Sequence, residues 1–148
     1  MEEKKFKEII QFAIEKEIAS VDFYKKASQL AKHSGTKELF VDFSREEEGH
    51  RKLLENLNAQ KIAQVRIQSI PDLKISDYMI DAELKPDISY AEILRVAMKR
   101  EEHSVKLYTD LREPVKDEEM KKIFTFLIQE ETKHKYRIEK IYDDEILK

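Results

Sequence analysis

The chain has 148 residues, 40% of them charged and 41% hydrophobic, with only 2 Gly and 3 Pro, a composition that favours long helices over sheets. Its net charge of -3 gives no sign of a nucleic-acid-binding surface. It contains no Cys, which excludes disulfides, thiolate metal ligands and thiol catalysis within this chain.

Apolar spacing predicts two helices in the first half of the chain. The first should run from about Glu2 to Lys32, and Ser34-Gly35 should then supply a left-handed cap at its C-terminus. Thr36 is the expected N-cap of the second helix, which should reach about Gln60.

Two further helices are predicted in the second half. The third should open at the capping box Ser89–Glu92 and end near Pro114. The fourth should be capped by Asp117 and run to about Glu145.

The stretch between the two hairpins, residues 61–88, has no clean period and contains Pro71 and Pro86. A helix of about 25 residues is roughly 38 Å long, a distance that such a stretch spans easily when extended. We therefore expect one all-α domain over residues 1–148, with hairpins at about 2–60 and 89–146 joined by a long crossover in an up-down-down-up bundle. Exposed apolar crossover residues such as Tyr78 and Ile80 favour a homodimer.

The two halves repeat at a fixed offset of 84 residues without any insertion. The offset places Tyr24 on Tyr108 and His50 on His134, and the chain has only 6 Tyr and 4 His. Chance similarity between charged helices explains such matches poorly. We infer two helical hairpins that pack with pseudo-twofold symmetry.

The predicted core stripe of each helix is apolar at its ends and polar in its middle. The polar positions lie at similar heights and are Glu17, Glu47, His50, Glu101, Glu131 and His134. Four buried carboxylates without partners would repel each other and lose hydration, and no Lys or Arg lies on the stripes. Two divalent cations would neutralise them, and imidazole with carboxylate suits iron, manganese or zinc.

One Glu-x-x-His is a weak signal, but two copies, each paired with a stripe Glu, form a strong one. The copies are Glu47-Glu48-Gly49-His50 and Glu131-Thr132-Lys133-His134. The neighbouring Glu46 and Glu130 should turn away from the centre, and a solvated face is favoured over an extra ligand at both positions.

These residues resemble the rubrerythrin family of ferritin-like di-iron proteins, over both hairpins and thus most of the chain. The resemblance implies that Glu47 and Glu131 bridge two iron ions. It also implies terminal ligand roles for the stripe residues Glu17, Glu101, His50 and His134. Tyr24 and Tyr108 resemble the tyrosines that hydrogen-bond such ligands in this family.

The chain departs from the family pattern in two respects. It lacks the Cys-ligated iron of rubrerythrin itself, so the resemblance implies a bundle-only member that takes electrons from an external donor protein. In bacterioferritins, which share the double motif, a haem-binding Met follows the first bridging Glu. Glu48 occupies that place here, so haem is not expected.

The resemblance implies an enzyme that reduces hydrogen peroxide or uses dioxygen, and the N-terminal residues favour a cytoplasmic location. The same ligands would serve a ferroxidase that handles iron, or a metal-stabilised bundle without catalysis. The N-terminal residues lack the apolar core of a secretion signal, and no apolar run is long enough to cross a bilayer. Neither membrane nor nucleic acid is expected as a partner.

Overall fold

The structure is a computed structural model that describes residues 2–60, 78 and 87–147. Within these ranges the chain forms helices α1 (Glu2–Leu30), α2 (Ser34–Gln60), α3 (Tyr90–Arg112) and α4 (Glu118–Glu145). The predicted all-α four-helix fold is confirmed. None of the described helices combines the length and apolar character that spanning a membrane requires.

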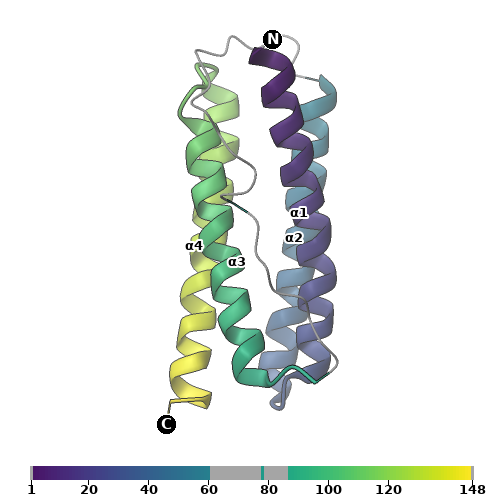
Figure 1. Cartoon of the computed structure of the whole chain (residues 1–148), viewed down its shortest axis with the longest axis vertical. Coiled ribbons are helices and arrows are strands. Elements are labelled where there is room, and N and C mark those ends of the chain that lie inside the picture. The colour runs from purple at the N-terminus through teal and green to yellow at the C-terminus, as the bar shows by residue number, and fades with distance from the viewer. Residues whose placement is uncertain (1, 61–77, 79–86, 148) are drawn as a thin grey trace.

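The helices pack as two antiparallel hairpins, α1 with α2 and α3 with α4 (Figure 1). The hairpins meet where α1 contacts α3 and where α2 contacts α4. Helix α3 begins at the end of the bundle where α1 ends, so α2 and α3 run in the same direction, as predicted (Figure 1). The predicted crossover lies outside the described residues except for Tyr78, Asp87 and Ile88.

The second hairpin begins its helices with the predicted caps. The hydroxyl of Ser89 accepts a hydrogen bond from the backbone N–H of Glu92 at 3.1 Å. A carboxylate oxygen of Asp117 accepts from the N–H of Glu119 at 2.9 Å and of Met120 at 3.5 Å. Each cap satisfies helix N–H groups that would otherwise lack a partner.

The first hairpin turns differently from the prediction. Ser34 and Gly35 are the first residues of α2, and no described glycine has a positive φ, so the predicted left-handed cap is wrong. The N–H of Lys37 donates to the carbonyl of His33 at 2.9 Å, which extends α2 toward its N-terminus. Thr36 therefore lies inside the helix that it was expected to cap.

Two apolar clusters fill the bundle on either side of its mid-height. One lies toward the chain's N-terminus and includes Phe6, Leu57 and Phe124, which have no exposed surface or almost none. The other lies toward the α1–α2 turn and includes Phe40 and Ile138. The polar middle of each core stripe is thus held between two layers of close-packed side chains.

Tyr78 does not have the exposed position that was expected of it. Only 2% of its surface is exposed, and it packs in the cluster that contains Phe6. Its hydroxyl donates to a carboxylate oxygen of Asp110 at 2.7 Å, and the Lys106 ammonium lies 5.5 Å from its ring centroid. Tyr78 is therefore anchored to the bundle and offers almost no surface to a partner. Ile80 lies outside the described residues, and the homodimer stays a prediction.

Replacing Tyr78 with Phe should lower the free energy of unfolding by about 1–2 kcal/mol, because the hydrogen bond from its hydroxyl to the Asp110 carboxylate is lost while the ring stays buried. Urea denaturation measures the change. Tyr136→Phe is the control, since its ring is 63% exposed and its loss of a hydroxyl should change stability by less than about 0.5 kcal/mol. Equal effects of the two substitutions would contradict the anchoring role.

Candidate metal centre

The structure brings all six predicted polar stripe residues together at mid-height in the bundle. None is more than 3% exposed. They come from all four helices and are Glu17 of α1, Glu47 and His50 of α2, Glu101 of α3, and Glu131 and His134 of α4. The heptad-like spacing of each helix places these side chains inward, and the antiparallel packing brings them to one level.

The six residues form two sets of four that share two members. The first set consists of Glu17, Glu47, His50 and Glu131, and the second consists of Glu47, Glu101, Glu131 and His134. Within each set, one ligand-type atom per residue lies within 4.8 Å of the others. Glu47 and Glu131 belong to both sets, as expected of a site in which two metal ions share two carboxylate ligands.

Both histidines face the carboxylates through Nδ1. Nδ1 of His50 lies 3.1 Å from Glu47, 3.3 Å from Glu131 and 3.7 Å from Glu17, measured to the nearer carboxylate oxygen of each contact. Nδ1 of His134 lies 3.4 to 3.6 Å from the three carboxylates of the second set. The two imidazole rings are nearly parallel, with centroids 6.2 Å apart and an interplanar angle of 23°.

The donor atoms of this cluster lack hydrogen-bond partners in the part of the chain that the structure describes. This holds for both carboxylate oxygens of Glu47 and Glu131, for one oxygen each of Glu17 and Glu101, and for Nδ1 of both histidines. Buried groups of this kind are costly unless something satisfies them. Oxygen and imidazole donors facing one another fit two divalent cations of the iron, manganese or zinc type.

Two buried tyrosines hold the outer glutamates, and they do so across the two halves. Tyr24 on α1 donates its hydroxyl hydrogen to Oε1 of Glu101 on α3. Tyr108 on α3 donates to Oε1 of Glu17 on α1. In each glutamate the other oxygen, Oε2, is left without a partner and available to a cation. Burial and the neighbouring carboxylates raise the pKa of both tyrosines well above the usual range, so the hydroxyls keep their protons and remain donors.

Electrostatics without a cation favour protons on the cluster. Burial raises the pKa of Glu101 to about 7, and burial together with the charge of Glu131 raises the pKa of Glu47 well above its usual range. Burial also opposes charge on Glu131, but the close contact with the His50 imidazole, 3.3 Å away, prevails and lowers the pKa of Glu131 to about 2. For His134, burial is outweighed by Glu101 and Glu46, which raise its pKa to about 10. A metal ion must displace these protons when it binds.

A contact between Glu46 and His134 was not predicted from the sequence. Glu46 turns away from the carboxylates, as expected, but its Oε2 contacts Nε2 of His134 in addition to facing solvent. The position of Glu46 in the sequence, one residue before Glu47, could not predict its contact with a residue of another helix. Glu130 also turns away from the centre and pairs with Lys133 at 3.5 Å.

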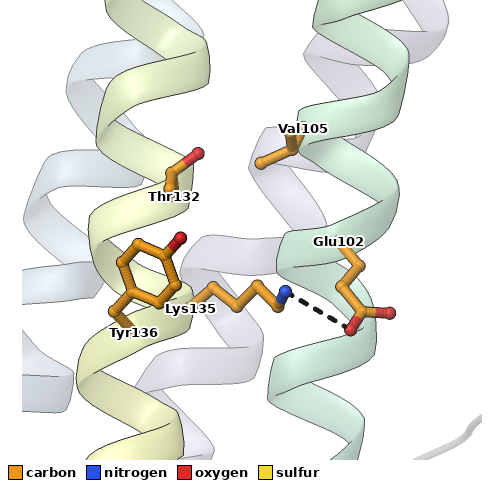
Figure 2. Close-up of a pocket in the computed structure, with 5 residues that line it drawn as sticks. All are labelled: Glu102, Val105, Thr132, Lys135 and Tyr136. Carbon is orange, nitrogen blue, oxygen red and sulfur yellow. Dashed lines mark ion pairs between the residues drawn. The ribbon is translucent and has the colours of Figure 1, made fainter.

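A surface hollow of about 250 Å³ lies between the outer faces of α3 and α4. Figure 2 shows Lys135 reaching from α4 toward Glu102 on α3, with 3.7 Å between Nζ and Oε1. The other lining residues are Val105, Thr132 and Tyr136. None of the six clustered residues lines this hollow, so it is not an opening into the metal centre.

The sequence pattern of the rubrerythrin family matches residues 8–142. The chain belongs to the rubrerythrin family. No curated protein sequence matches the chain.

Solved structures confirm the ferritin-like fold of this rubrerythrin-family chain. A hypothetical protein from Pyrococcus furiosus matches with a TM-score of 0.75 and 29% identity, over 93% of this chain and 88% of the other. A Thermotoga maritima protein described as a ferritin-like diiron-carboxylate protein matches with a TM-score of 0.76 and 18% identity, over 92% and 93%. The silver-bound form of CopM matches with a TM-score of 0.70 and 17% identity, over 95% and 97%.

Replacing Glu47 with Gln should change the stability of the metal-free chain at pH 7 by less than about 1 kcal/mol, because the raised pKa keeps the Glu47 carboxyl protonated and Gln is a neutral side chain of similar size. The same change should abolish the rise in melting temperature that a divalent cation produces, because both sets lose a shared ligand. Thermal melts with and without cobalt(II) measure both effects, and the exposed Glu15→Gln is the control. A variant that loses stability without metal and keeps the metal effect would contradict this assignment.

The melting temperature of the metal-free protein should fall between pH 6 and pH 9. His134 and Glu101 have pKa values of about 10 and about 7, above their ordinary values, so the folded state binds more protons than the unfolded state in this window. Stability from these groups is present at low pH and is lost as pH rises. Glu131, with a pKa of about 2, contributes no change over this range.

Metal affinity should change with pH in the opposite direction. Deprotonation of the cluster frees its ligands, so calorimetry should show proton release at pH 7 and tighter binding at pH 8 than at pH 6. Affinity that is constant over this range would show that the protonated cluster is not the binding site.

Proposed function

We propose that this chain is a di-iron redox enzyme that reduces hydrogen peroxide with electrons from an external donor protein. The observation that carries the proposal is the pair of carboxylate–histidine sets sharing Glu47 and Glu131, with all their free donor atoms buried. Membership of the rubrerythrin family favours iron as the metal and peroxide as the substrate.

In this proposal the two ions would share Glu47 and Glu131 as ligands, and each of the remaining four residues would bind one ion. Glu17 and His50 belong to one ion and Glu101 and His134 to the other, as the two sets divide them. When bound, two ferrous ions supply the two electrons with which hydrogen peroxide and two protons are converted to two waters.

The chain's own residues hold and shield this centre. The hydroxyls of Tyr24 and Tyr108 fix one oxygen of each outer glutamate, which keeps the other oxygen directed at its ion. The apolar clusters on either side keep bulk water from the centre, which strengthens electrostatic interactions within it. Because the chain has no Cys for an iron–sulfur or rubredoxin-like site, we propose that electrons arrive from another protein.

The proposal predicts rapid oxidation by peroxide. Chain loaded anaerobically with ferrous iron should be oxidised by hydrogen peroxide faster than the same concentration of free ferrous iron, with one peroxide consumed per two irons. Stopped-flow absorbance measures the rate. Glu131→Gln should reduce the rate to that of free iron because it removes a shared ligand, and the exposed Glu15→Gln should behave as the unmodified chain.

Two results would contradict the peroxidase proposal. Oxidation no faster than that of free iron would mean that the centre does not react with peroxide. Oxidation that is fast with dioxygen but slow with peroxide, in an assembly of many subunits that retains ferric iron, would instead indicate a ferroxidase.

A further inference from the structure

The two histidines of the metal centre occupy equivalent positions in the repeat but have different surroundings. Nε2 of His134, the nitrogen that faces away from the carboxylates, contacts Oε2 of Glu46. In the described part of the chain, no acidic side chain forms an ion pair with Nε2 of His50. The repeat counterpart of Glu46 is Glu130, and its carboxylate pairs with Lys133 on its own helix.

The ring contacts of the two histidines also differ, and His134 again has the closer partner. The ring of Phe43 stacks on His134 with centroids 4.0 Å apart and an interplanar angle of 25°. The repeat counterpart of Phe43 is Leu127, which offers no ring to His50. Apart from its nearly parallel neighbour His134, His50 has a T-shaped ring contact with Phe126, with centroids 6.0 Å apart, and Phe126 is 45% exposed. His134 is thus held on its face by Phe43 and at its outer nitrogen by Glu46, and among the described residues His50 has no equivalent of either contact.

Glu46 acts on the centre through His134 and is not itself placed to bind an ion. Its contact is with the ring nitrogen opposite Nδ1, while Nδ1 lies 3.4 Å from Glu101 and 3.5 Å from Glu47. A hydrogen bond from Nε2–H to a carboxylate fixes the tautomer whose Nδ1 lone pair is free, and makes that nitrogen a better metal donor.

We propose that Glu46 is a positioning residue that makes the two metal positions unequal, so that the ion bound by Glu101 and His134 is held more tightly and binds first. The ion bound by Glu17 and His50 then enters second and leaves first. This inference rests on the metal centre of the proposed function and is independent of the reaction with peroxide. The asymmetry originates in residues that differ between the repeats, Phe43 and the contact of Glu46, while the ligands themselves are the same in both.

Cobalt(II) titration tests the order of binding, since cobalt(II) absorbs in the visible range and shifts or broadens nearby nuclear resonances. The complete chain, labelled with ¹⁵N-histidine, is titrated with cobalt(II) in competition with a chelator. We expect two ions per chain in two resolved steps, with the His134 resonances affected in the first step and the His50 resonances in the second.

Glu46→Ala should weaken the first step about 10- to 100-fold and leave the second within about twofold, so that the two steps merge. Glu46→Gln should fall between, because its amide oxygen still accepts from Nε2–H without carrying charge. The matched control is Glu130→Ala, which should retain both steps. In the metal-free chain, the Nε2–H resonance of His134 should exchange with water faster in Glu46→Ala than in Glu130→Ala.

Any of the following results would overturn the proposal. The His50 resonances could respond first or together with those of His134, or the substitutions at Glu46 and Glu130 could have equal effects. A chain that binds no cobalt(II) would remove the metal centre itself, and with it the proposed function. Two ions bound with equal affinity would refute only the inequality. Thermal melts of the variants, both altered at partly exposed side chains, separate loss of binding from loss of folding.

Discussion

The burial of four carboxylates at one level of a narrow bundle is the constraint on which the rest of this structure depends. Side chains of this kind repel one another and lose hydration, and the two histidines cannot pair with all of their oxygens. Without a cation the cluster retains protons, as the raised pKa values of Glu101 and His134 indicate. Two divalent ions would remove both problems at once, because they would satisfy the donor atoms that lack partners and neutralise the charge.

The surrounding fold is organised to hold this unfavourable cluster in place. Apolar layers close it above and below, and the hydroxyls of Tyr24 and Tyr108 tie α1 to α3 by hydrogen bonds that cross between the halves. The buried polar residues in the middle of each helix lower the stability of the fold, and the close-packed apolar side chains toward the helix ends offset this loss. With apolar packing on both sides of the polar middle, the bundle would hold the six side chains in a fixed geometry for two metal ions.

The metal centre could largely be predicted, because its residues follow the helix period and occur in both halves of the repeat. The stripe positions and the 84-residue offset identified the six clustered residues, since a helix fixes which side chains share a face. The α1–α2 turn was not predictable, because a Ser-Gly pair suits a left-handed cap and a helix start alike. Tyr78 was wrongly expected at the surface, because the segment around it has no regular period that would show which of its side chains face the core. The contact of Glu46 with His134 joins different helices, and spacing along one helix cannot reveal such a contact.

Anomalous X-ray diffraction at the iron edge, on crystals of the chain loaded anaerobically with ferrous iron, would show whether the buried cluster binds two metal ions. We expect two peaks inside the bundle, both in contact with Glu47 and Glu131. One peak should also contact Glu17 and His50, and the other the two remaining residues of the cluster. A single peak, or peaks only on exposed carboxylates with the buried cluster empty, would contradict the claim that these side chains are gathered to bind two metal ions.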